Sequence, residues 1–244
     1  MDPSTIATDD PTTPESPPRQ APPPGEAGVG EMIPYVAPMF AFLALTSLEG
    51  YVPQSWYPLA YAAKVAVVAG VAIAYRSTWR DFLPIPRIGT LALGVVVGLI
   101  VYVLWVRLDG LYPALSFLGK RTGFDPTEMP AGWRAAFIAV RFLGLVLLVP
   151  VIEELFWRSF LIRWIIDPNF HAVPIGRVTL LSAGATSALF ALAHPEWLPA
   201  LLTGILWAGL LWRTKSLLAC FISHLVANLA LGIHVLRTGE WQYW

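Results

Sequence analysis

Charged side chains and cysteine are scarce in this sequence. Asp, Glu, Lys and Arg make up only 13% of its 244 residues, against about 25% in a typical soluble domain. Basic and acidic residues number 16 each, so the net charge is zero. The positive excess by which many proteins hold nucleic acid is missing, and no nucleic-acid partner is expected. The single cysteine, Cys220, cannot form an internal disulfide and is predicted to be a small core residue.

The first 31 residues have almost no large apolar side chains. They are rich in Pro, Thr and acidic residues. Such a segment cannot bury enough surface to offset the entropy of ordering, so residues 1–31 are predicted to form a disordered tail. A basic stretch followed by an apolar one is also missing here, so no secretory signal peptide is expected. Residues 32–244 are then predicted to form one domain.

Long apolar runs occupy the rest of the chain. Hydrophobic residues make up 56% of the sequence, and the mean hydropathy is +0.61. The runs lack the alternation typical of barrel strands, so the predicted fold is an all-α, multi-pass bundle of about eight transmembrane helices. Membrane lipid is therefore an expected partner, and an integral location is expected, in the plasma or inner membrane if the source is bacterial. The runs cover residues 33–49, 57–75, 89–106, 134–149, 151–166, 178–193, 198–212 and 216–236.

Pro150 separates the fourth run from the fifth. Proline removes a backbone hydrogen bond and clashes with the preceding turn of a helix. Residues 134–166 are therefore predicted to form either one long helix kinked at Pro150 or two shorter helices. Elsewhere, Gly94 and Gly98 form a pair of small residues four apart, which would let a neighbouring helix approach closely.

Residues near the ends of the runs bear on their placement in a membrane. Trp and Tyr, among them Tyr57 and Trp105, cluster there as in an interfacial aromatic belt. Lys64 is predicted to snorkel toward the interface, and Arg134 and Arg141 to snorkel or to contact lipid headgroups.

Basic residues in the breaks bear on orientation. An arginine-rich second break favours the cytoplasmic side, so the N-terminal tail is predicted to be cytoplasmic too. The third break would then lie outside although it also holds basic residues, so the pattern is imperfect. The residues concerned are Arg76, Arg80 and Arg87 in the second break, and Arg107, Lys120 and Arg121 at the third.

Several ionisable and amide side chains lie inside the apolar runs of the C-terminal half. Such residues cost a few kcal/mol in a membrane, so they usually face a bundle interior or a wet cavity and serve a function. Those on one run are mostly spaced four apart, which places each pair on one helix face. We expect them to converge on one cavity, with Glu153 facing it because it points away from the neighbouring ion pair. In chain order they are Glu153, Glu154, Arg158, His194, His224 and Asn228.

Structural roles are the alternatives for the same side chains. Glu154 and Arg158 suit a purely structural ion pair, and His194 suits a membrane interface because it precedes a proline. His224 and Asn228 suit hydrogen bonds between helices. Buried ionisable residues also build the proton relays of transporters, although the internal repeats common in transporters are not seen here.

Three spaced motifs carry a resemblance to a known family. They are Glu153-Glu154-x-x-x-Arg158, Phe190-x-x-x-His194 and His224-x-x-x-Asn228, in this order on separate apolar runs. Together they resemble the CAAX-processing and bacteriocin-processing protease family (CPBP, also called Abi), over roughly residues 130–236. The resemblance implies an intramembrane endopeptidase, often of eight helices. It also implies that Glu153 is the catalytic base, that Glu154 and Arg158 support it, and that His194, His224 and Asn228 complete the site.

The chemistry of the motifs suits peptide hydrolysis. A buried carboxylate is a usable base for water near neutral pH, and His224 and Asn228 are expected to donate hydrogen bonds to the oxyanion. The alternative is a divalent metal such as zinc on His194, His224 and Glu153. Because the compact His-Glu-x-x-His motif is missing, the metal-free scheme is favoured and no cofactor is expected.

The predicted substrate is a membrane-associated protein or peptide. Within the family it would be a C-terminal CAAX-like or sorting-signal segment, or a leader peptide. An inactive scaffold or immunity protein with the family fold, and a proton-coupled transporter, are the competing functions.

Overall fold

A computed structural model describes residues 28–119 and 123–244 of the chain. Within these ranges the regular structure is entirely helical, which confirms the predicted all-α fold. Most of the predicted disordered tail, residues 1–27, lies outside the described residues. The last residues of that predicted tail are described, and helix α1 begins among them at Val29.

The connections between the helices differ in length, and the longest separates α3 from α4. Single 3₁₀ turns supplement them at Gln54–Trp56, Arg76–Phe82, Ser116–Leu118, Phe170–Ala172 and Trp241–Tyr243. The α-helices are α1 (Val29–Glu49), α2 (Tyr57–Ala74), α3 (Ile88–Leu108), α4 (Ala131–Phe142), α5 (Val149–Glu153), α6 (Ile162–Ile166), α7 (Leu180–Leu192), α8 (Trp197–Thr214) and α9 (Leu217–Thr238).

Helices α4, α5 and α6 form one continuous helical span. Two wide π-helical segments, Leu143–Leu148 and Glu154–Leu161, join them without a break. The whole span, Ala131–Ile166, has 36 residues. Of the two predicted arrangements around Pro150, the single long helix is therefore the one observed.

In the part of the chain that the structure describes, five helical segments are long and apolar enough to cross a membrane. Their apolar faces remain exposed on the outside of the bundle, which suits contact with lipid. Helix α7 is apolar but shorter. These segments support an integral membrane protein. They are Val29–Glu49, Gln54–Ala74, Ile88–Leu108, Ala131–Ile166 and Leu217–Thr238.

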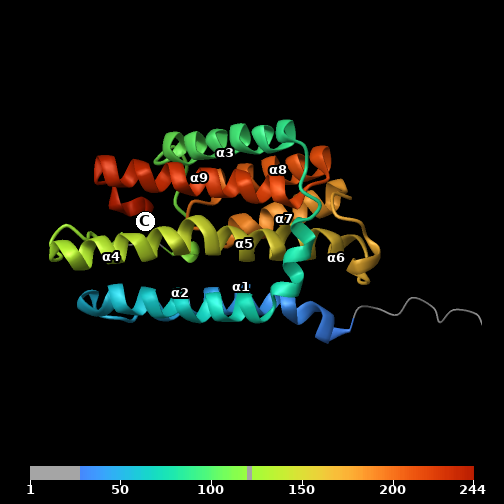
Figure 1. The fold of residues 1–244 in the computed structure, drawn as a ribbon. Coiled ribbons are helices and arrows are strands. Elements are labelled where there is room, and N and C mark those ends of the chain that lie inside the picture. Colours follow the sequence, from blue (N-terminus) through green and yellow to red (C-terminus); the bar gives the residue numbers. More distant parts are fainter. Residues whose placement is uncertain (1–27, 120–122) are drawn as a thin grey trace, which may run out of the picture.

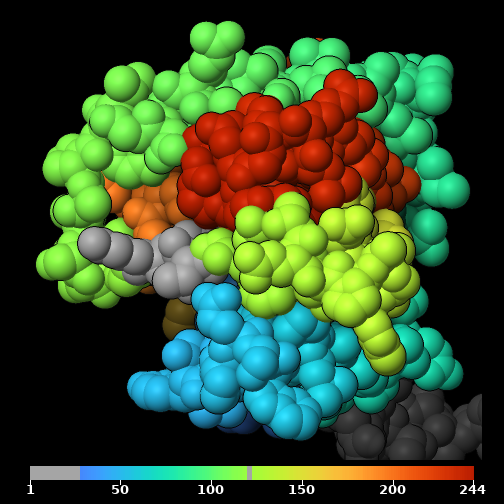
Figure 2. Space-filling model, turned by 90° about the vertical axis from the view of Figure 1, so that its left-hand side faces the viewer, coloured from blue at the N-terminus to red at the C-terminus, as the bar shows by residue number. Residues whose placement is uncertain are grey.

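The long helical span lies in the middle of the bundle (Figure 1). Helices α1 and α2 lie on one side of it, and α3, α8 and α9 lie on the other. The turn between α1 and α2 and the start of α4 lie at the same end of the bundle. Space-filling atoms at this end show residues near 50–60, the start of α4 and the C-terminal segment next to one another (Figure 2).

Close packing of α3 on α9 depends on the predicted glycine pair. A Cβ atom on Gly94 would lie 2.7 Å from the carbonyl oxygen of Ala219, and one on Gly98 would collide with the carbonyl of Ser223. Both neighbours are backbone atoms of α9, which cannot move aside cheaply. The predicted close approach is thus confirmed. Cys220 lies nearby and is fully buried, which confirms it as a core residue.

Candidate active site

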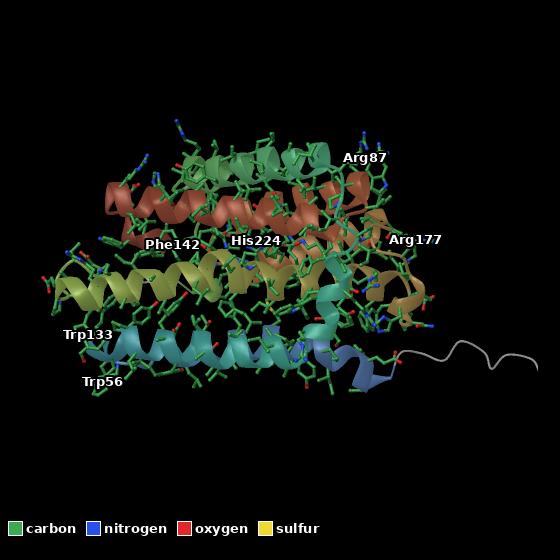
Figure 3. All side chains as sticks on the ribbon, in the orientation of Figure 1. Trp56, Arg87, Trp133, Phe142, Arg177 and His224 are labelled. Carbon is green, nitrogen blue, oxygen red and sulfur yellow. The ribbon has the colours of Figure 1, made fainter. Side chains whose placement is uncertain are left out.

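A cavity of about 640 Å³ reaches from one end of the bundle to its middle. Its lining at that end includes Gln54 and Gly123, from the loops beside the start of α2 and before α4, and we call this end the cavity mouth. Farther in, the walls are formed by α1, α2, α3, the central span and α7 to α9. His224 projects between α9 and the central span (Figure 3).

The predicted site residues divide into two groups. Glu153, His194, His224 and Asn228 line this one cavity, although they come from three separate parts of the chain. Glu154 and Arg158 do not line it; they are almost completely buried behind it, at 0% and 1% exposure. The shared cavity expected from the motifs therefore exists, with the Glu154–Arg158 pair outside its wall.

Glu153 is the last residue of α5, where the first wide turn has ended and the second begins. Its side chain is 4% exposed and reaches the cavity. Consecutive residues of a helix point about 100° apart, so Glu154 faces a different neighbour. The two adjacent carboxylates therefore have separate surroundings.

His194 lies just beyond the end of α7 and is held by its own helix. Its Nδ1 is 2.7 Å from the carbonyl oxygen of Phe190, one turn earlier. A carbonyl only accepts hydrogen bonds, so Nδ1 carries the proton, and Nε2 is the acceptor of the neutral ring. The ring also packs on Phe190 at 4.5 Å and on Trp105 at 5.8 Å between ring centres. These contacts fix a base at the cavity wall.

His224 is oriented from behind by Glu154. Its Nδ1 lies 2.9 Å from Oε1 of Glu154, and its ring packs on Trp207 at 4.3 Å between centres. Glu154 accepts the Nδ1 proton, which leaves Nε2 as the nitrogen available to the cavity. The sequence predicted that Glu154 supports Glu153. The structure adds a partner that the sequence did not predict, since Glu154 contacts His224, 70 residues later in the chain.

Arg158 completes this buried chain of contacts. Its Nη1 lies 3.4 Å from Oε1 of Glu154, four residues earlier, as the spacing predicted. The guanidinium lies between two aromatic rings, 4.8 Å from the centre of Phe190 and 4.7 Å from that of Trp207. Cation–π attraction on both faces offsets part of the cost of burying the charge. The pair is thus both a structural ion pair and the support of His224.

Asn228 bonds to the central span at its irregular point. Its Nδ2 donates to the carbonyl of Leu145 at 2.7 Å. In this wide turn the N–H of Val149 donates to Gly144, five residues back. The matching donor for Leu145 would be residue 150, which is proline and has no N–H. Asn228 therefore supplies the donor that Pro150 lacks.

A metal ion held by His194, His224 and Glu153 is the alternative arrangement of the site. A catalytic zinc ion takes three protein ligands and leaves one position open. Among residues 28–119 and 123–244, no three His, Cys, Asp or Glu side chains are grouped so that they could share a metal ion. The predicted alternative ligands, His194, His224 and Glu153, do not fit a common ion in this arrangement. The reaction proposed below therefore does not use a metal ion.

The structure corrects the predicted position of two basic residues, which the sequence analysis placed at the membrane interface. Lys64 and Arg141 are each 6% exposed and line the cavity, so neither snorkels to the lipid surface. Tyr57 and Trp105, interpreted as belt residues, also line the cavity. The sequence held a signal for Lys64 and Arg141 as cavity residues. Each is a charge inside an apolar run, which was also the criterion that selected Glu153.

The arrangement defines a class of protein: a membrane helix bundle with carboxylate, imidazole and amide groups around one buried cavity. Residues 135–230 match the model of a family described as Rce1-like, type II CAAX prenyl endopeptidase. This match confirms the resemblance predicted from the three motifs, and the matched segment contains every predicted site residue. No curated protein and no solved structure matches the chain.

Proposed function

We propose that the chain is an intramembrane endopeptidase whose water nucleophile is activated by Glu153. The substrate is a membrane-associated protein or peptide, cleaved within a C-terminal CAAX-like or sorting-signal segment or a leader. One observation carries the proposal: Glu153, His194, His224 and Asn228, far apart in the sequence, line a single cavity in the bundle. The family match supports peptide hydrolysis as the reaction class.

The proposed reaction begins when Glu153 activates a water molecule. The Glu153 carboxylate takes a proton from water while the water oxygen attacks the carbonyl carbon of the peptide bond. The tetrahedral intermediate carries the negative charge on the former carbonyl oxygen. Its collapse breaks the C–N bond, and the proton that Glu153 took from water passes to the leaving nitrogen. The products are a carboxylic acid and an amine.

His224 stabilises the intermediate in this scheme. With a proton on each ring nitrogen, it donates from Nδ1 to Glu154 and from Nε2 toward the cavity. Glu154 keeps the ring oriented and balances its charge. The amide of Asn228 has a second N–H besides the one bonded to Leu145. In the proposal both groups donate to the oxyanion, a contribution of about 10²–10³ in rate for one such donor in other enzymes.

The purified protein in lipid vesicles tests the proposal with fluorogenic peptides that have apolar C-terminal segments. Glu153→Gln should lower kcat by about 10⁴-fold or more, because it removes the base but keeps the shape. Glu128→Gln is the matched control, since Glu128 is exposed on a loop outside the cavity. Full activity of Glu153→Gln would refute the assignment. Absence of hydrolysis by the wild-type protein would favour an inactive scaffold.

Chelation of the same preparation tests the metal-free scheme. If Glu153 and His194 act on water unaided, extensive chelation should leave kcat unchanged, and elemental analysis should find substoichiometric zinc. Stoichiometric metal whose removal stops turnover, and whose return restores it, would make the protein a metalloprotease. His224→Ala is then informative, because it would remove both the metal and the activity. Proton flux into vesicles without hydrolysis would instead favour a transporter.

A further inference from the structure

Arg141 differs from the other buried basic residues of the described chain. Lys64 pairs with Glu49 at 2.5 Å, Arg158 with Glu154 at 3.4 Å, and Arg163 with Asp81 at 3.1 Å. Arg141 is buried to the same degree, yet no described carboxylate lies within ion-pair distance of it. A buried charge is costly unless it is paired, so its counter-ion is expected from outside the described residues.

The contacts of Arg141 hold its guanidinium without neutralising it. Nη1 donates to the hydroxyl of Tyr57 at 2.5 Å, and the guanidinium carbon lies 4.5 Å from the ring centre of Tyr61 and 5.6 Å from that of Trp244. The buried Nε has no hydrogen-bond partner in the described residues. Aromatic faces hold a cation in place, and an unused N–H remains for an anion. The site is therefore built to receive negative charge.

Arg141 shares the cavity with Glu153, and their separation along the helix is known. Both line the cavity, and Arg141 precedes Glu153 by 12 residues on the same helical span, which is about 18 Å along a helix axis. An extended peptide covers this distance in about five residues. Arg141 also lies on the side of the cavity mouth, since it contacts Tyr57 at the start of α2.

We infer that Arg141 binds the C-terminal carboxylate of the substrate, so that the bond cleaved at Glu153 lies within about five residues of a free chain end. This inference rests on the proposed hydrolytic function. A guanidinium pairs with a carboxylate through two parallel hydrogen bonds, which fixes both position and direction. The short C-terminal fragment then lies toward the mouth and leaves through it, while the remainder of the substrate lies on the other side of Glu153.

Two forms of one peptide test the inference, one with a free C-terminal carboxylate and one with a C-terminal carboxamide. The wild-type protein should show a KM about 10- to 100-fold higher for the amide. Arg141→Met should raise KM for the acid by the same factor and leave the amide unchanged. Arg134→Met is the matched control, because Arg134 lies two turns earlier, outside the cavity, and bonds only to the carbonyl of Thr127. It should alter neither KM.

A binding measurement separates this inference from the proposed function. In the Glu153→Gln background, the acid peptide should bind more tightly than the amide, and Arg141→Met should abolish the difference even if no peptide is ever cleaved. Arg141→Lys keeps the charge but loses the paired hydrogen bonds, so it replaces Arg141→Met if that variant does not fold.

Two results would overturn the inference. One is equal affinity and equal KM for acid and amide in the wild-type protein, whether or not hydrolysis occurs. The other is competition at Arg141 by vesicles of phosphatidylglycerol, but not of phosphatidylcholine, without any preference for the acid peptide. That second result would assign the site to a lipid phosphate.

Discussion

The two neighbouring carboxylates, Glu153 and Glu154, have different physical tasks. Glu153 faces a cavity, where a substrate can reach it. Glu154 is fully buried between the imidazole of His224 and the guanidinium of Arg158. Each partner satisfies a charge that would otherwise cost several kcal/mol in the interior. The second carboxylate therefore acts on chemistry only through His224.

Glu154→Gln should destabilise the protein more than it alters the shape of the site. The amide keeps an oxygen for His224 but leaves the cation of Arg158 without its charge partner, which costs about 3–5 kcal/mol. Thermal unfolding followed by tryptophan fluorescence in detergent measures this loss. The double variant Glu154→Gln/Arg158→Met should recover part of it, because no unpaired charge remains. Unchanged unfolding of the single variant would contradict the buried-pair account.

The sequence predicted contacts within one helix better than contacts between helices. Spacing of four along a helix identified the Glu154–Arg158 contact, since that contact is local. The contact of Glu154 with His224 spans 70 residues and depends on how helices dock, which local spacing does not encode. Arg141 was misplaced for the same reason. Its burial comes from Tyr57, Tyr61 and Trp244, which belong to other elements.

At the scale of the element, the irregular central span is the main feature. Regular α-helix gives way twice to wide turns, one just before Pro150 and one just after Glu153. Wide turns of this kind often occur at functional sites. Here the first wide turn leaves a carbonyl for Asn228, and the second begins at Glu154. Proline signalled an irregularity in the sequence, but its form depends on the amide from α9.

Asn228→Ala should lower both the stability of the protein and its kcat. Adding Pro150→Ala should separate the two losses. Loss of the amide leaves the Leu145 carbonyl without its donor, at a cost of about 1–3 kcal/mol. Alanine at position 150 restores an N–H, so the stability loss should shrink in the double variant. If Asn228 also donates to the oxyanion, a loss in kcat of about 10²-fold should persist. Full rescue of kcat by Pro150→Ala would show that Asn228 only braces the helix.

At the scale of the whole molecule, charge is distributed unequally between the two ends. Arg87 and Arg177 mark one end, and Trp56 and Trp133 mark the other, where the cavity mouth lies (Figure 3). Connections at the first end carry Arg76, Arg80, Arg87, Arg177 and Lys215, against Asp81 and Asp167. Among the described residues, loops at the second end hold Asp109, Asp125, Glu128, Glu196 and Glu240. Basic loops favour the cytoplasmic side.

The charge distribution predicts that the start of α1 is cytoplasmic and that the cavity mouth opens on the opposite side. Cysteine labelling tests this in a Cys220→Ala background. Thr127→Cys should react with a membrane-impermeant maleimide on intact cells, and Ser77→Cys should react only after permeabilisation, since both positions are exposed but at opposite ends. The reverse pattern would place the mouth in the cytoplasm.

Composition and periodicity predicted the all-helical bundle because lipid permits few alternatives. Gly94 and Gly98 predicted a close helix contact, and α9 is the helix that makes it. The cavity was not predictable in its full extent, since its walls include Lys64 and Tyr61 of α2, which lie outside the three motifs. Motifs report side chains on one segment at a time, whereas a cavity is a property of the assembled bundle.

The contacts made by α9 have a consequence for biosynthesis. Ribosomes make the chain from its N-terminus, so the central span, with Glu153, Glu154 and Arg158, exists before His224 and Asn228 do. Until α9 is inserted, Glu154 lacks its contact with His224, and the Leu145 carbonyl lacks the donor from Asn228. The proposed hydrolytic activity is therefore expected to begin only after α9 has been inserted.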